Sequence, residues 1–356
     1  MNVNHLLRKY IEDAVGYTPG GTPLPAAPAD IPFCKLNANE NMLGPSEKVV
    51  AAMSEALKDM HLYPGKETEL TRQAIADYHN LPTTKINLGA GSSSLICAIH
   101  EIFLNPEDEV VIADPSYVAY RLLANRFGAK LVKIPTKDYA CDTKAMLEAI
   151  NEKTKLVCIV NPNNPTGAKI TNEELHHYFD NVPDHVITIV DEAYIDWVDD
   201  ESFESAVQFV DSHKVIVLRT FSKLFALAGL RFGYSIANEA IAQHLDKFEF
   251  NYAPNRLVLK AVRVALEDKD YIARSIANNT QGRNYIYDAL CQYDFEVVKS
   301  YTSFIYFKPD RDPNQLMLDL NQKGVLLRPF GEFLRVSIGR PEQNEQFVNA
   351  LKDIMG

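Results

Sequence analysis

The sequence lacks the features of disulfide-rich, membrane-spanning and nucleic-acid-binding proteins. Its five cysteines are scattered over 356 residues without a CxxC pair, so they indicate no disulfide framework. No apolar run approaches the roughly 18 residues of a membrane-spanning helix, and residues 1–15 lack the apolar stretch of a signal peptide. The 36 Lys and Arg are outnumbered by 47 Asp and Glu, which argues against nucleic acid or an anionic membrane as the main partner. We therefore expect a soluble cytoplasmic protein.

Metal-binding motifs and internal repeats are also missing. There is no HExxH sequence and no paired Cys and His spacing, so we expect no metal site. What the chain does have is the composition of a globular protein, 46% hydrophobic and 23% charged. Its length predicts two domains, or three.

The most informative stretch surrounds Lys223, which follows an apolar run at 215–218. Two hydroxyl side chains, Thr220 and Ser222, flank it, and Arg231 comes eight residues later. A lysine amine can hold an aldehyde as a Schiff base, while hydroxyls and a guanidinium bind a phosphate. Pyridoxal phosphate is the cofactor that needs this combination. A lysine after a strand is most often a solvated surface residue. Other motifs in the chain are therefore needed to support a cofactor-binding role for Lys223.

Short apolar runs alternate with helical stretches from residue 85 onward, which predicts an α/β fold with a mostly parallel sheet and helices on both faces. Ligands of such sheets bind beyond the carboxyl ends of the strands. Polar turns follow four of the predicted strands, at 89–94, 114–120, 161–167 and 191–194. Helix starts are also marked, by Ser46 as an N-cap and by a capping box from Thr171 to Glu174.

The side chains in these turns suit the cofactor that Lys223 suggests. Asp191 ends a strand and could keep a pyridine nitrogen protonated, and Asn164 and Tyr194 could hydrogen-bond the oxygen of the same ring. Tyr117 could stack on a flat ring. The small residues and hydroxyls at 89–94 could close backbone N–H groups around a phosphate at a helix start.

The last third of the chain mixes helices with short strands and predicts a smaller α+β unit. We expect strands at 230–236, 296–301 and 303–308 and around Arg335. The predicted division is an N-terminal arm at 1–35 that joins the small domain, a large domain at 36–250, and a small C-terminal domain at 251–356.

Taken together, these stretches resemble the class I/II pyridoxal-phosphate aminotransferases of fold type I, and most closely the histidinol-phosphate aminotransferase family. The matching segments occur in family order over nearly the whole chain: LNANENMLGP (36–45), YPG (63–65), GAGSSSLI (89–96), DPSYVAY (114–120), NPNNPTG (161–167), DEAYIDW (191–197), TFSKLFALAGLRFGY (220–234) and FLRVSIG (333–339).

The resemblance implies a role for each matching residue. Lys223 would form the Schiff base and move the proton, Asp191 would pair with the pyridine nitrogen, and Tyr117 would stack on the ring. Contacts to the ring oxygen would come from Asn164 and Tyr194. The phosphate would be held by Gly91, Ser92, Ser93, Thr220, Ser222 and Arg231, together with Tyr63 of a neighbouring subunit, so a homodimer with shared sites is implied. Substrate would be bound by Tyr17, Asn39 and Arg335.

Three departures from the family pattern concern the substrate more than the cofactor. Family members commonly have acidic residues where this chain has Ser93 and Ser94. They usually have a small residue at the position of Leu224 and a glycine at that of Ala226. Family members often have a second substrate-binding arginine at the position that we expect Gln346 to occupy in this chain.

The function implied is a pyridoxal-phosphate-dependent aminotransferase that moves an amino group from histidinol phosphate or an amino acid to a 2-oxo acid such as 2-oxoglutarate. Alternatives on the same fold are an aromatic or other amino-acid aminotransferase, a decarboxylase of the threonine-phosphate type, and a racemase. A non-enzymatic regulatory module is disfavoured because no DNA-binding domain is attached and every catalytic group is present.

Overall fold

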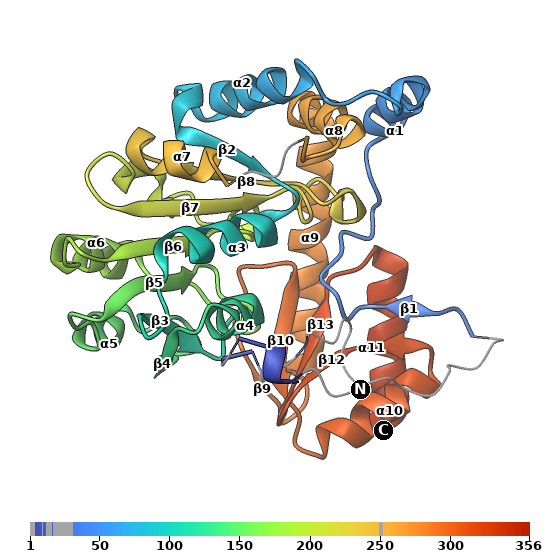
Figure 1. The fold of residues 1–356 in the computed structure, drawn as a ribbon. Helices are drawn as coiled ribbons and strands as arrows, with labels where there is room; N and C mark the ends of the chain where they lie inside the picture. Colours follow the sequence, from blue (N-terminus) through green and yellow to red (C-terminus); the bar gives the residue numbers. More distant parts are fainter. Residues whose placement is uncertain (1–3, 9, 12–15, 17–30, 249–251) are drawn as a thin grey trace.

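The computed structural model describes residues 4–8, 10–11, 16, 31–248 and 252–356. Within these residues the strands form three sheets, of which the largest lies beside a smaller one, and helix α9 (Lys269–Leu290) runs along both (Figure 1). No helix in the described part of the chain is long and apolar enough to cross a membrane.

The largest sheet has seven strands in the order β2-β8-β7-β6-β5-β3-β4. Six of them run in the same direction, and β8 is antiparallel to both of its neighbours. Their bounds are β2 Ile86–Gly89, β3 Glu109–Asp114, β4 Lys130–Pro135, β5 Thr154–Val160, β6 Ile187–Asp191, β7 Val215–Thr220 and β8 Gly233–Ala237. The prediction of an α/β fold with a mostly parallel central sheet is confirmed.

Helices cover both faces of this sheet, which explains why its central strands are apolar throughout. Successive residues of β5 alternate between two hydrophobic clusters, since Val157 and Ile159 lie in one and Leu156 and Cys158 in the other. One face is covered by α3 (Ser92–Phe103), α4 (Val118–Arg126) and α7 (Glu239–Asp246). The other is covered by α1 (Glu47–Ala56), α2 (Glu67–His79), α5 (Thr143–Glu148), α6 (Asn172–Asn181) and α8 (Arg256–Glu267).

The predicted helix starts are confirmed. The Ser46 side chain accepts a hydrogen bond from the Val49 amide at the start of α1, and Thr171 and Glu174 form a reciprocal capping box on α6. Each cap satisfies backbone donors that have no partner within the first turn of a helix.

The second sheet is antiparallel, in the order β12-β13-β10-β9. One of its faces packs against a third hydrophobic cluster with α9, α10 and α11, which includes Ile286, Leu334 and Phe347. The remaining bounds are β9 Glu296–Val297, β10 Phe304–Lys308, α10 Pro313–Gln322, β12 Arg328–Phe330, β13 Phe333–Ser337 and α11 Pro341–Met355. Strands β1 (Cys34–Lys35) and β11 (Val325–Leu326) pair in parallel, so the segment at 34–35 is joined to the C-terminal part of the chain.

Two strand predictions were wrong at their ends. The strand expected at 230–236 begins only at Gly233, because Ala228–Leu230 form a 3₁₀ turn and Arg231 is left-handed at φ +55°. The strand expected at 296–301 ends at Val297. The proposed domain boundary at residue 250 stays a prediction; α8, just beyond it, packs in the same cluster as α1 and α2.

Candidate active site

Lys223 lies at the carboxyl edge of the large sheet, facing the small one. Strand β7 ends at Thr220, and the turn that follows brings Lys223 Nζ to 3.0 Å from the Asn39 carbonyl and 5.4 Å from the centre of the Tyr194 ring. Burial, together with the nearby positive charges of Arg335 and Arg231, lowers the pKa of this lysine to about 8. The amine is therefore more easily deprotonated than that of an ordinary surface lysine.

Asp191 ends the neighbouring strand β6 and is only 3% exposed. Burial raises the pKa of its carboxyl to about 6, although two hydrogen bonds favour the charged form. The Tyr120 hydroxyl donates to Asp191 Oδ2 at 2.9 Å, and the Ala193 amide donates to Oδ1 at 3.1 Å. A carboxylate held in this way can accept a proton or a hydrogen bond from a bound cation-forming ring.

Tyr120 was missed by the sequence reasoning, although a signal was present. It stands three residues after Tyr117 at the start of α4, and residues three apart in a helix share a face. Tyr117 and Tyr120 accordingly lie edge to face with ring centres 6.1 Å apart.

An anion-binding arrangement lies where β2, β7 and β8 meet. After β2 the chain passes through Gly91, which has a φ of +83° and is the N-cap of α3; the helix begins at Ser92. Arg231 is exposed and lies against this helix start, since a Cβ on Gly91 would come within 2.6 Å of its Nη2. No carboxylate among the described residues pairs with Arg231, which donates a hydrogen bond to the Ala228 carbonyl at 2.9 Å.

A guanidinium and the positive end of a helix repel each other unless an anion lies between them. The hydroxyl of Thr220 adds to the same place, where it accepts a hydrogen bond from the Ser222 amide. The residues present therefore fit a phosphate group. Ser93, one of the departures, has its hydroxyl 3.5 Å from that of Tyr117, while Ser94 turns back to the Gly91 carbonyl.

The small sheet contributes Arg335 from β13. Its guanidinium donates to Asn164 Oδ1 at 2.6 Å and to the Asn37 carbonyl at 3.1 Å. It is sandwiched between the Phe304 and Phe330 rings, each 5.1 Å from Cζ to the ring centre. Stacking between aromatic faces fixes the plane of a guanidinium, the group that binds planar anions through its edge.

Asn39 joins the two sheets. Its side-chain amide donates to the Tyr194 hydroxyl at 2.9 Å, and its Oδ1 accepts from Ser337 of β13 at 3.0 Å. Burial raises the pKa of Tyr194 to about 12, so this phenol stays protonated. The structure thus brings together Lys223, Asp191, Tyr194, Asn39, Asn164 and Arg335 from separate segments of the chain.

Tyr17 lies outside the described residues. Tyr63 and Gln346 are described but do not join this group in a single chain. Tyr63 is 70% exposed and stacks on Tyr252, with ring centres 4.0 Å apart. The Gln346 amide donates to the Pro32 and Lys323 carbonyls, beside the paired strands β1 and β11.

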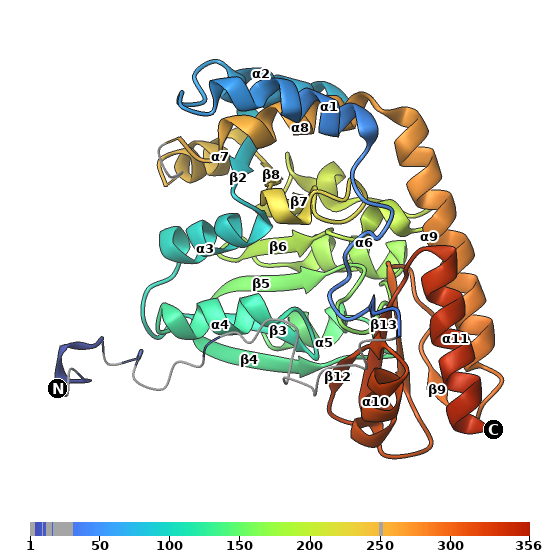
Figure 2. The same ribbon diagram turned by 90° about the vertical axis from the view of Figure 1, so that its right-hand side faces the viewer.

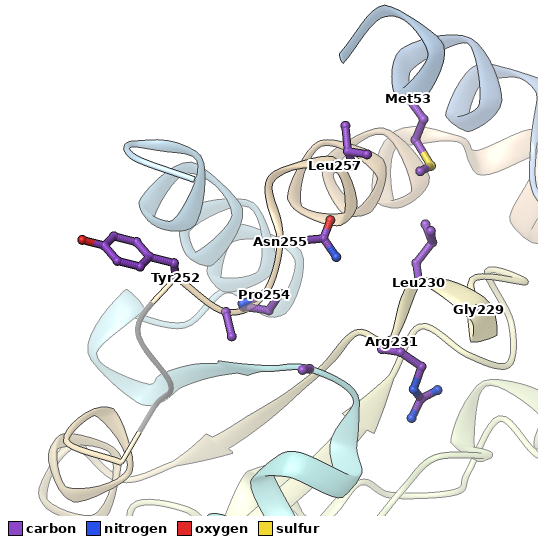
Figure 3. Close-up of a pocket in the computed structure, with 10 residues that line it drawn as sticks. Met53, Gly229, Leu230, Arg231, Tyr252, Pro254, Asn255 and Leu257 are labelled. Carbon is purple, nitrogen blue, oxygen red and sulfur yellow. The ribbon is translucent and has the colours of Figure 1, made fainter. Parts of the chain in front are cut away.

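A hollow of about 500 Å³ opens beside the anion-binding arrangement. Arg231 lines one side of it, and Tyr252 and Asn255 line another (Figure 3). The lining therefore extends from Tyr252, which stacks on Tyr63, to Ala90, two residues before the start of α3.

Comparison with known proteins gives a consistent result. A family model described as aminotransferase class I and II matches residues 31–351. Histidinol-phosphate aminotransferase 1 of Idiomarina loihiensis is 34% identical over 328 residues, which cover 90% of this chain and 89% of that protein. The solved histidinol-phosphate aminotransferase from Clostridium acetobutylicum has a TM-score of 0.83 at 25% identity, covering 90% of this chain and 99% of that chain. That from Sinorhizobium meliloti in complex with pyridoxal-5'-phosphate has a TM-score of 0.86 at 24% identity over 91% of each chain, a likeness of fold.

Proposed function

The chain belongs to the class I and II aminotransferases, and from that premise we propose its cofactor site, its amino donor and the residues that carry the reaction. It is an aminotransferase with the fold of the pyridoxal-phosphate-dependent enzymes. The observation that carries the proposal is the Lys223 amine, with its lowered pKa, at the same sheet edge as the buried carboxylate of Asp191.

Pyridoxal phosphate would bind with its phosphate at the start of α3. Gly91, Ser92 and Ser93 would offer backbone and hydroxyl donors, and Thr220, Ser222 and Arg231 would complete the phosphate site. Tyr117 would stack on the ring, and Asn164 and Tyr194 would hydrogen-bond its oxygen. When bound, this cofactor supplies an aldehyde that carries the amino group and a ring that stores electrons.

The chain's own residues would supply the proton movements. Lys223 Nζ would hold the cofactor covalently until the donor arrives, and its freed amine would then move a proton from the donor's α-carbon. A pKa of about 8 keeps a useful fraction of this amine neutral near neutral pH. Asp191, ionised above about pH 6, would accept the ring N–H and keep that nitrogen protonated.

The donor we propose is histidinol phosphate, with 2-oxoglutarate as an acceptor. The proposal is supported by the relatives' names and by Arg335, a guanidinium held edge-on for an anionic group. Asn39 would contact the same substrate. An aromatic or other amino-acid donor is the nearest alternative, since the aromatic rings around Arg335 suit a planar side chain as well as an imidazole.

We also propose a homodimer with shared sites. Apolar side chains are exposed on α1, on the turn after it and beside the hollow: Val50, Leu57, Met60, Leu62, Tyr63 and Tyr252. Large apolar side chains left exposed to water favour a protein interface. A second copy would cover these side chains and could bring its own Tyr63 to the phosphate site through the hollow.

A single-turnover absorbance experiment on the cofactor-loaded protein tests the donor. Histidinol phosphate, aromatic, acidic and basic amino acids, and threonine phosphate are added one at a time. Conversion of the cofactor to its amino form within one turnover by histidinol phosphate is the expected result. Conversion by another amino acid alone would replace the donor, and a spectral change without the amino form would favour a decarboxylase or racemase.

A further inference from the structure

Asn163 has a fully buried side-chain amide, stands one residue before Asn164 and has no role in the proposed reaction. Its exposed fraction is 0%. Nδ2 donates to the Pro115 carbonyl and to the Thr166 hydroxyl, both at 3.0 Å, and Oδ1 accepts from the Ser116 hydroxyl at 2.9 Å. Both N–H groups of the amide are therefore used, and no water is needed to satisfy them.

These bonds cross from one strand end to the next. Pro115 and Ser116 follow β3, whereas Asn163 follows β5, and the two strands are neighbours in the sheet. The backbone of Asn163 is fixed as well, because its amide donates to the Ala168 carbonyl and its carbonyl accepts from the Gly167 amide, both at 2.8 Å. Asn163 therefore holds the 161–167 turn closed and ties it to the 114–117 turn.

The residues next to these contacts are the ones proposed to touch the cofactor ring. Tyr117 follows Ser116 directly, and Asn164 follows Asn163 directly. A backbone neighbour of a fixed residue moves little, so the Asn163 amide determines how far apart the Tyr117 ring and the Asn164 side chain lie. Asn164 also accepts a hydrogen bond from Arg335 at 2.6 Å. The position of Asn164 therefore also affects Arg335, the residue proposed to bind the substrate.

We propose that Asn163 is a positioning residue that sets the distance between the stacking ring of Tyr117 and the ring-oxygen contact of Asn164. The inference rests on the proposed function, because those two roles are part of it. Asn163 touches neither cofactor nor substrate; it acts through its neighbours. Loss of its amide would allow the two turns to move apart and would weaken the grip on the ring without removing any ring contact.

The test compares apoprotein carrying Asn163→Ala with the wild type and with Asn344→Ala. Asn344 is a suitable control because it is a buried amide, 2% exposed, that also bridges backbone, to the amide and carbonyl of Gly339. Affinity for pyridoxal phosphate is titrated by absorbance, and the induced circular dichroism of the cofactor band reports how the ring is held. Melting of each apoprotein reports the purely structural cost.

We expect Asn163→Ala to bind the cofactor roughly 3- to 30-fold more weakly, as loss of one or two hydrogen bonds predicts, with an altered dichroic band. Asn344→Ala should lower the melting temperature but leave affinity and dichroism unchanged. Ser116→Ala, which removes only one of the two side-chain hydrogen bonds between the turns, should shift both readouts in the same direction by a smaller amount, and it keeps the test available if Asn163→Ala does not fold.

Different results would overturn the proposed function and the positioning role of Asn163. Wild-type protein that shows no saturable cofactor binding would overturn the proposed function. Wild-type protein that binds, with Asn163→Ala or Ser116→Ala indistinguishable from it in affinity and dichroism, would overturn the positioning role alone. Equal shifts in Asn344→Ala and Asn163→Ala would show a general loss of packing and would also overturn it.

Discussion

The two sides of the candidate site are built in different ways. On the large-sheet side, Asp191 ends one strand and Lys223 follows the adjacent parallel strand, and Tyr120, the partner of Asp191, comes from a helix that covers the same sheet. On the small-sheet side, Arg335 depends on Asn164 from one part of the chain and Asn37 from another. The first side is fixed by strand order, whereas the second exists only when separate segments are assembled.

This difference suggests which residues serve the reaction and which serve the choice of substrate. Groups at the ends of adjacent strands keep their spacing through any change in the surrounding loops, which suits a reaction common to a whole family. Groups held across an assembled junction change with small sequence differences, which suits the choice of substrate. Substitutions on the large-sheet side should therefore alter turnover, and those on the small-sheet side should alter which donor is accepted.

The largest effect is expected from Lys223→Ala. Loss of the amine removes both the covalent attachment and the proton transfer, so kcat should fall at least about 10⁴-fold, the upper range for a general base. The phosphate site around Arg231 remains, so the cofactor should stay bound without a covalent link. Borohydride reduction followed by mass spectrometry measures the attachment, and turnover near the wild-type rate would exclude Lys223 as the catalytic lysine.

Arg335→Gln should have the next largest effect and should be confined to the donor. Removal of a buried charge that pairs with a substrate anion costs roughly 2–5 kcal/mol, so kcat/KM should fall about 30- to 5,000-fold. Cofactor affinity should stay within about twofold of the wild type. Lys308→Gln, on the exposed end of β10, is the control, and a loss of cofactor affinity in Arg335→Gln would mean that the arginine serves Asn164 instead.

Tyr120→Phe tests the large-sheet side through pH. The Tyr120 hydroxyl stabilises the charged form of Asp191, so its removal raises the carboxyl pKa, by about one unit or more. Affinity of the apoprotein for pyridoxal phosphate should fall as pH drops through about 6 in the wild type, and at higher pH in the variant. Tyr178→Phe, another fully buried tyrosine whose hydroxyl meets Thr188, should leave the midpoint unchanged.

The smallest effect is expected from Ala226→Gly and concerns stability alone. Ala226 has a φ of +55° in the turn after Lys223, a conformation that costs a non-glycine residue about 1–2 kcal/mol. After the entropy that glycine loses on folding is subtracted, the free energy of unfolding should rise by about 0.5–1 kcal/mol. Ala228→Gly, in the ordinary 3₁₀ turn next to it, should not be stabilised, which denaturant unfolding of both apoproteins would measure.

The large-sheet side was accessible from the sequence because its signals are local. Apolar runs that end in polar turns give the strand ends, and parallel strands bring those ends to one edge. The confirmed sheet follows from this pattern. Motif positions such as Asn164 and Tyr194 then fall at that edge without any knowledge of the tertiary structure.

The rest depended on contacts between distant segments. The partner of Asp191 is on a helix 71 residues away, and no local pattern distinguishes Tyr120 from a packed tyrosine. The contacts of Gln346 could not be predicted either, because a position counted along α11 does not reveal which segments that face meets; its amide donates to the Pro32 and Lys323 carbonyls. The β8 start was wrong because Arg231 adopts a backbone conformation that arginine rarely takes.

Helix α9 is a long rod that spans the molecule. Its 22 residues make a rod of about 33 Å, which begins at Lys269 beside α8 and runs past the small sheet (Figure 2). Near its far end, Ile286 and Leu290 pack in the same hydrophobic cluster as Leu334 and Val336 of β13. A tilt of about 10° at the α8–α9 corner would carry the far end through about 6 Å, by the length of such a rod. The Lys48–Asp268 ion pair lies at this corner, so a change of angle there would be magnified near the strand that carries Arg335.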